Sequence, residues 1–184
     1  MLNRTKIIIP VVLMLSFWVV TAQAQVPNPK SAEENTDETF YKQLKLTTGK
    51  DDALIYQAMG MGYFEQGKFE KSYTFFKKAA KLNPKLYWSW YYLGILQMAD
   101  PREFFKKAIE ANPRFAPPYY WLGRYYCKAK DIKESIKYFQ DYIKAAKNDV
   151  NEADRIQIAE YFILSMQHGE TDYDTISRMS KQAS

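Results

Sequence analysis

The stretch from Tyr56 to Pro84, YQAMGMGYFEQGKFEKSYTFFKKAAKLNP, contains a pattern that recurs twice further along the chain. The first copy comprises Tyr56, Met59, Gly60, Tyr63, Ser72, Phe76, Ala79 and Pro84. The second comprises Trp90, Leu93, Gly94, Phe105, Ala108 and Pro113, and the third comprises Tyr119, Leu122, Gly123, Tyr126, Ser135 and Phe139. Gly and the later Phe are 16 positions apart in the first and third copies and 11 in the second, so the second copy is five residues shorter.

The spacing within each copy predicts two helices that pack closely. Residues three and four positions apart share one face of a helix, as the aromatic and apolar positions of each copy do. A Gly lacks a side chain at the point where two helices approach, and the small residues Ser72 and Ser135 hold the matching position on the second helix. Pro84 and Pro113 stop the second helix before the next one begins. Unrelated amphipathic helices are the alternative, but three ordered copies favour a true repeat.

These three copies resemble the tetratricopeptide repeat, a helix–turn–helix unit of about 34 residues. The resemblance covers residues 53–147 and implies an all-α fold, a solenoid of about three repeats with a C-terminal capping helix. Most members of this family bind other proteins, so the resemblance favours a binding role over catalysis. In the third copy Lys147 stands where the family's Pro would be.

The chain is expected to divide into four segments. These are a signal peptide (1–24), an extended segment and short helix (25–50), three repeats with the second one shortened (51–148), and a capping helix and tail (149–184). We expect a helix at 37–46, preceded by a capping box of Ser31 and Glu34. Helices are then predicted at 52–66, 69–82, 87–99, 101–111, 117–129, 132–147 and 151–167, with a short last helix after 171. Asp100 is predicted to cap the helix at 101–111, with Pro101 as its first residue.

The first 24 residues have the layout of a secretory signal peptide. Arg4 and Lys6 precede an apolar run over residues 7–20, and Ala22-Gln23-Ala24 is a small-residue cleavage signal. An uncleaved membrane anchor is the alternative, but the run is shorter than the roughly 20 residues that a spanning helix needs. We therefore expect an exported protein with no membrane span after cleavage. A bacterial periplasm is favoured, with an extracellular or outer-membrane-associated location as the other outcomes.

Composition bounds the class of partner. The formal charge of +5 falls to about +3 without Arg4 and Lys6, and the remaining lysines are scattered. Solvated outer faces explain them better than a nucleic-acid track, so no nucleic acid is expected. The single cysteine, Cys127, rules out a disulfide within the chain. Burial as a small apolar residue and an intermolecular disulfide both stay open for it.

No catalytic or cofactor-binding pattern stands out in the sequence. The one histidine, His168, falls at a predicted turn, and neither a phosphate-binding glycine loop nor a metal-ligand cluster is present. Carboxylate pairs such as Asp51 and Asp52 lie at predicted helix starts, where they favour the helix dipole. We expect no enzyme activity, no metal and no cofactor.

The resemblance implies that the first helix of each repeat lines the concave surface of the solenoid. The residues carried over to that surface are Leu54, Gln57, Met61, Phe64, Trp88, Tyr91, Ile95, Met98, Tyr120, Arg124, Cys127 and Lys128. Of these, the expected partner-binding groove comprises Leu54, Met61, Phe64, Trp88, Tyr91, Ile95, Tyr120, Arg124 and Lys128. Only Arg124 and Lys128 are basic, so the family's clamp for an acidic peptide C-terminus is not expected.

Two alternatives remain open for this groove. Trp90 is predicted to lie in the core, whereas Trp88 and Tyr91 fit either the groove or the core between repeats. The N-terminal segment or a second copy of the chain could also cover the groove. The expected function is therefore a protein-binding or scaffold module for a partner with apolar or aromatic anchors. The alternative is an assembly subunit of an envelope complex that acts by self-association.

Overall fold

The computed structural model describes residues 29–97 and 100–183, which form helices joined by short connections and include no strand. The elements are α1 (Pro29–Thr48), α2 (Asp52–Glu65), α3 (Phe69–Leu82), α4 (Tyr87–Leu96), α5 (Arg102–Ala111), α6 (Pro117–Lys128), α7 (Ile132–Ala146), η2 (Val150–Glu152), α8 (Ala153–Gln167) and α9 (Tyr173–Ala183). The boundary between two compact units falls within α1, after Gln43. The predicted signal peptide lies outside the described residues.

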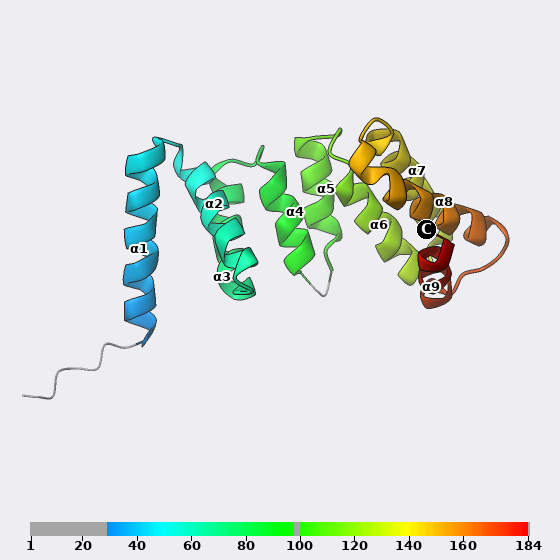
Figure 1. Cartoon of the computed structure of the whole chain (residues 1–184), viewed down its shortest axis with the longest axis horizontal. Helices are drawn as coiled ribbons and strands as arrows, with labels where there is room; N and C mark the ends of the chain where they lie inside the picture. Colours follow the sequence, from blue (N-terminus) through cyan, green and yellow to red (C-terminus); the bar gives the residue numbers. More distant parts are fainter. Residues whose placement is uncertain (1–28, 98–99, 184) are drawn as a thin grey trace, which may run out of the picture. The chain divides into compact units, whose positions relative to one another are not determined.

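From α2 onward the helices pack in successive pairs. The hairpins α2–α3, α4–α5 and α6–α7 each contact the next along the chain, and α7 then contacts α8 (Figure 1). Each hairpin corresponds to one of the three copies in the sequence. The predicted all-α solenoid of tetratricopeptide type is therefore confirmed.

Each repeat Gly lies directly under the ring of its Phe. A Cβ built on Gly60 would come within 3.0 Å of the Phe76 ring, and one on Gly123 within 2.9 Å of the Phe139 ring. In the second repeat a Cβ built on Gly94 would come closest, within 2.6 Å of the Phe105 ring. These distances confirm that glycine is needed for close helix approach within each hairpin.

A buried hydroxyl closes the first and third hairpins. Ser72 Oγ donates to the carbonyl oxygen of Gly60 at 2.9 Å, and Ser135 Oγ donates to that of Gly123 at 2.8 Å. The matching position in the second repeat, four residues before Phe105, is Pro101, which has no hydroxyl. The second hairpin therefore lacks this bond.

The turn between the two helices of a repeat requires a left-handed residue. Gly67 has φ +71° between α2 and α3, and Lys130 has φ +61° between α6 and α7. Both lie seven positions after their repeat Gly. Glycine adopts this conformation freely, whereas Lys130 adopts it at a steric cost.

The second repeat is shortened in both of its helices. α4 ends at Leu96 rather than at the predicted residue 99, and α4 and α5 have 10 residues each against 14 in α2 and α3. Gln97 is extended (φ −89°, ψ 105°), which ends the helix. Pro101 holds the N-cap position of α5 without a side-chain capping bond, and Asp100 Oδ1, one residue earlier, accepts from Arg102 N at 3.1 Å. Helix α5 starts one residue later than predicted because Pro101 precedes its first turn.

An Asn-Pro joint connects successive repeats. Asn83 Oδ1 accepts from the backbone N of Lys85 at 3.0 Å, and Trp90 Nε1 donates to the carbonyl oxygen of Pro84 at 2.8 Å. The same two bonds recur at the next joint, from Arg114 N to Asn112 Oδ1 (3.1 Å) and from Tyr119 Oη to the carbonyl oxygen of Pro113 (3.0 Å). The aromatic residue of each incoming repeat is thus held by the proline that ends the previous one.

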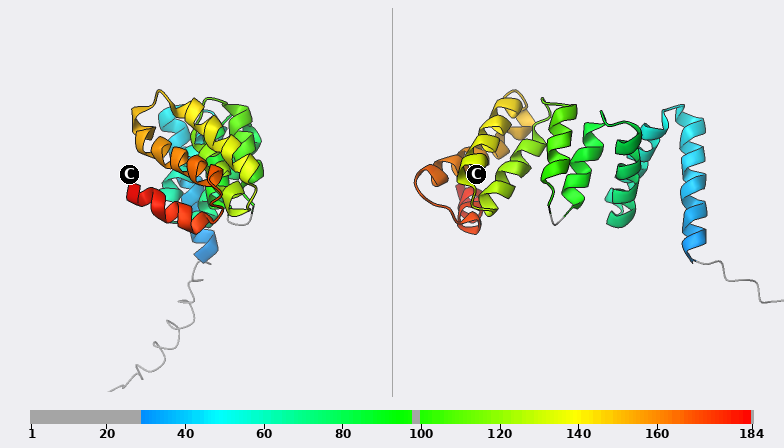
Figure 2. Two further views of the ribbon diagram at one scale, coloured as in Figure 1. Left: turned by 90° about the vertical axis from the view of Figure 1, so that its right-hand side faces the viewer. Right: turned by 180° about the vertical axis from the view of Figure 1, so that it is seen from behind.

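Both ends of the chain differ from expectation. α1 starts at Pro29, earlier than the predicted helix at 37–46, so Ser31 lies inside a helix rather than capping one. At the other end, the predicted helix from 151 is a 3₁₀ turn followed by α8. The last helix, α9, buries Ile176 and contacts both α8 and α6, and it lies beside α8 in each view of Figure 2.

Candidate protein-interaction surface

The predicted groove residues differ widely in exposure. Leu54, Met61 and Phe64 of α2 are half-buried, as are Tyr91 and Ile95 of α4, whereas Trp88 is 39% exposed. Lys128 is exposed at the end of α6. Tyr120 and Cys127 are buried, and Met98 lies outside the described residues. The accessible part of the expected groove is therefore on the first two repeats and at Lys128.

An aromatic cluster surrounds Trp88. Its ring centroid lies 4.6 Å from that of Phe115 and 5.8 Å from that of Tyr91, and the Tyr91 and Phe115 rings are 5.3 Å apart. Trp121 Nε1 donates to Tyr91 Oη at 3.2 Å. Burial raises the pKa of the Tyr91 hydroxyl, which favours the neutral form. Trp88 is the member of this cluster that solvent reaches most.

Phe115 was missed by the sequence analysis. It lies in the joint between α5 and α6, two residues after Pro113, where no helical periodicity marks an apolar residue as a surface contact. The signal was available in the first joint, where Leu86 holds the corresponding position after Pro84. A pocket of about 660 Å³ opens beside Trp88 and Phe115. Its polar and charged lining includes Arg114, Asn148, Asp149 and Glu152.

The third repeat presents a different face because α9 packs against it. Tyr120 lies between Phe139 and Tyr142, with ring centroids 5.8 and 5.2 Å away, and is a core residue. Arg124 Nε donates to Tyr173 Oη of α9 at 2.7 Å. The covers expected from the sequence for the groove were the N-terminal segment or a second copy of the chain. In the structure the chain's own C-terminal helix engages Arg124.

Residues suited to metal chemistry do not come together. Across residues 29–97 and 100–183, no three His, Cys, Asp or Glu side chains are placed to hold a metal ion. Cys127 is free and buried, and burial raises the pKa of its thiol. None of the helices in the same part of the chain combines the length and apolar character needed to cross a membrane.

Two family models, both for the tetratricopeptide repeat, match residues 53–86 and 104–137. The chain therefore contains tetratricopeptide repeats. The first match covers the first repeat, and the second extends from α5 through α6 into α7. The segment between the two matches, 87–103, contains α4 and the first residues of α5.

A solved structure agrees with this fold. The structure of the MamA RS-1 ArsTM double mutant is similar with a TM-score of 0.53 and 18% identity, over 84% of this chain and 88% of that one. At this identity the similarity shows the fold alone. No curated protein matches the sequence. The tetratricopeptide repeats and the fold support a protein-interaction scaffold, a role for which this family is generally used without catalysis.

Proposed function

We propose that this protein is an exported scaffold that binds a protein segment with apolar or aromatic anchors. The observation behind this proposal is the exposure of Trp88 within a cluster of aromatic rings on α4 and the joint between α5 and α6. A large aromatic side chain that is held in place by neighbouring rings loses little entropy on binding, and such residues often dominate binding energy. The partner is expected to insert an apolar group beside Trp88.

The proposed contact surface begins with Trp88, Tyr91 and Phe115. Half-buried apolar residues of the first two repeats extend it: Leu54, Met61, Phe64 and Ile95. Tyr120 supports this surface from the core, and Arg124 is engaged by Tyr173, so neither is proposed as a direct contact. Exposed Lys128 adds one positive charge at its far end.

Binding to a captured partner tests this surface. After affinity capture from the native envelope, we expect Trp88→Ala and Tyr91→Ala to weaken binding by about 1–2 kcal/mol or more each, which is about tenfold or more in Kd. Leu164→Ala is the matched control, because Leu164 is 54% exposed on α8, away from the proposed surface. Normal binding by both variants, with folding preserved, would contradict the proposal.

Export is proposed from the sequence alone. Arg4, Lys6, the apolar run and Ala22-Gln23-Ala24 favour cleavage after Ala24 and a periplasmic location. Intact mass of the protein recovered from its native envelope should correspond to a chain that begins at Gln25. A membrane-bound product that still begins at Met1 would exclude cleavage.

Self-association is the second candidate function. Apolar side chains are exposed away from the Trp88 surface as well, such as Leu164 and Met179 (46% exposed), and favour contacts between copies. Sedimentation velocity over a range of concentrations distinguishes the two functions. A monomer at all concentrations favours the binding module, and a concentration-dependent oligomer favours the assembly subunit.

A further inference from the structure

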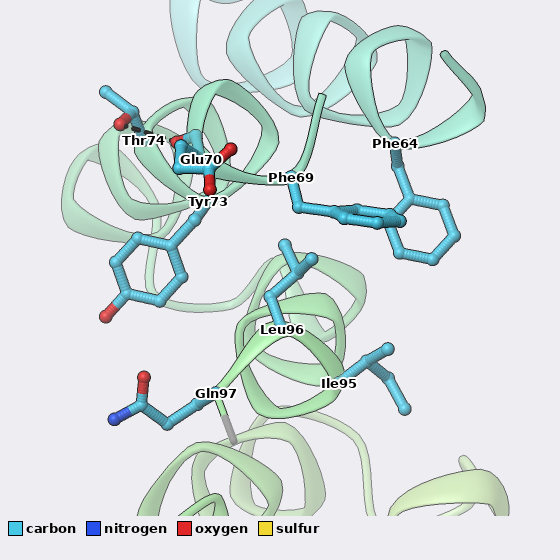
Figure 3. Close-up of a pocket in the computed structure, with 8 residues that line it drawn as sticks. All are labelled: Phe64, Phe69, Glu70, Tyr73, Thr74, Ile95, Leu96 and Gln97. Carbon is cyan, nitrogen blue, oxygen red and sulfur yellow. Dashed lines mark hydrogen bonds between the residues drawn. The ribbon is translucent and has the colours of Figure 1, made fainter. Parts of the chain in front are cut away.

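A second surface lies where the first repeat meets the shortened one. A pocket of about 710 Å³ opens between the start of α3 and the end of α4. Its lining comprises Phe64, Phe69, Glu70, Tyr73, Thr74, Ile95, Leu96 and Gln97 (Figure 3). We call this the α3–α4 pocket. Figure 3 shows the Phe64 and Phe69 rings on one side and Leu96 facing them.

The α3–α4 pocket exists because the second repeat is short. In a solenoid each repeat buries the exposed face of its neighbour, so residues missing from one repeat uncover part of the adjacent one. α4 stops at Leu96 and α5 starts at Arg102, whereas the first repeat keeps its full length up to Glu65 and from Phe69. Phe69 is consequently 51% exposed.

The lining of this pocket is mostly apolar and includes one charged side chain. Phe64 and Phe69 meet edge to face at 5.7 Å, and Phe64 packs in the same way on Tyr92 at 5.0 Å, so the aromatic wall is fixed from behind. Glu70 is the one charged side chain in the lining. Within the described part of the chain, no hydrogen bond or ion pair engages its carboxylate.

We propose that the α3–α4 pocket binds a segment of a partner protein that carries a bulky apolar side chain close to a Lys or Arg. The volume is in the range of pockets that enclose small ligands, and it accommodates one or two large side chains. The apolar anchor replaces the missing neighbour of Phe69 and Leu96, and the basic residue pairs with Glu70. A carboxylate at the rim of an apolar site selects a cationic partner more than it adds affinity. This inference rests on the proposed binding role and adds a second contact, which shares Phe64 and Ile95 with the surface around Trp88.

An array of designed dodecapeptides tests the chemistry directly. Each peptide has Leu, Met, Phe or Trp placed one to four residues from Arg, Glu or Gln, in a background of Gly and Ser. We expect the wild-type chain to bind Arg peptides at least about tenfold more tightly than the matching Glu peptides, measured by fluorescence anisotropy. Peptides without the apolar residue should not bind.

Three variants locate the binding. Glu70→Lys should reverse the preference from Arg to Glu peptides, and Phe69→Ser should weaken binding of both by about tenfold or more. Both residues are exposed, so the fold should tolerate these changes. Glu160→Lys makes the same charge change at an exposed site on α8 and should keep the wild-type preference. No binding, or a preference that Glu70→Lys leaves unchanged, overturns the proposal.

The same variants distinguish this proposal from binding of a second copy of the chain and from binding at the Trp88 surface. If the pocket serves a second copy of the chain, Phe69→Ser dissociates an oligomer in sedimentation velocity and the array shows no Arg preference, which overturns the proposal. If Glu70→Lys and Phe69→Ser bind the captured partner normally while Trp88→Ala does not, the Trp88 surface stands and the α3–α4 pocket is excluded. An Arg preference that persists in Trp88→Ala supports the pocket on its own.

Discussion

A Cβ on Gly94 would lie closer to the ring of Phe105 than one on Gly123 would to that of Phe139, although 11 positions separate the first pair and 16 the second. The shortened repeat therefore keeps the central contact of a full-length repeat. The missing residues come from the end of the hairpin where α4 would turn into α5. The close contact holds α4 and α5 together. The residues that this repeat lacks are missing from the end of α4 and the start of α5, where the two helices meet at the turn.

Alanine at Gly94 should destabilise the protein. Its Cβ would lie 2.6 Å from a buried Phe105 ring, and such overpacking typically costs about 1–3 kcal/mol. Gly62 is the matched control, because it lies in α2 with open space around its Cα, and Gly62→Ala should gain about 0.5–1 kcal/mol. Urea unfolding of both variants gives the sign of the change in the free energy of unfolding for each. A gain at Gly94 would contradict the packing.

The turn residues should respond in opposite directions. Lys130 has φ +61°, so Lys130→Gly should stabilise the protein by roughly 0.5–1 kcal/mol by relieving the left-handed strain. Gly67→Ala introduces that strain between α2 and α3 and should cost about 1 kcal/mol. Thermal unfolding compares them. If Lys130→Gly is less stable than wild type, side-chain contacts of Lys130 outweigh the strain.

Hydrogen exchange should be faster in α5 than in α3. α5 has 10 residues against 14, and its hairpin lacks the buried hydroxyl bond that Ser72 provides in the first repeat. Local opening is easier where fewer contacts hold a helix. Exchange of the amides of Arg102–Ala111 and Phe69–Leu82 followed by mass spectrometry makes the comparison. Equal protection would show that neighbouring repeats compensate fully.

Stability should fall at high pH because of Tyr142. Burial and the 2.6 Å hydrogen bond to Glu152 Oε2 raise the pKa of its hydroxyl above the ordinary value of about 10. The folded state then keeps a proton that the unfolded state loses, so this contribution is complete below about pH 10 and declines above it. Tyr142→Phe should show a shallower decline in the free energy of unfolding between about pH 9 and 11. Identical slopes would exclude Tyr142 as the cause.

Arg124 and Tyr173 should be energetically coupled. The guanidinium donates to Tyr173 Oη and lies over the Trp121 ring at 5.0 Å. A double-mutant cycle of Arg124→Met and Tyr173→Phe should give a coupling of about 1 kcal/mol, as for a partly exposed charge-assisted bond. Additive effects would mean that α9 is held by Ile176 and other apolar contacts alone.

The repeats were predictable because each depends on local spacing. Gly60 and Phe76 are on adjacent helices of one hairpin, so the pattern that identifies them also fixes their contact. The start of α5 was predicted to within one residue for the same reason, although Pro101 rather than Asp100 holds the N-cap position. What this part of the sequence did not show was the early end of α4, because the apolar residues after Tyr87 continue without a break signal before residue 98.

The candidate surface was less predictable because it depends on contacts between distant segments. Tyr120 holds the same repeat position as Tyr91, yet it is buried, because α7 and η2 supply Tyr142 and Glu152 around it. The contact of Tyr173 with Arg124 joins residues 49 positions apart. No repeat pattern encodes this contact, since α9 follows the last repeat.

The Asn-Pro joint sets the boundary between successive repeats by bonds that are local in the chain. The bonds that set it, from Lys85 to Asn83 and from Trp90 to Pro84, lie within eight positions of the chain and recur at the following joint. A segment copied between two such joints would bring its own geometry to both of its neighbours. Growth or loss of whole repeats by duplication and deletion of the gene is therefore open to this chain without redesign of the residues on either side.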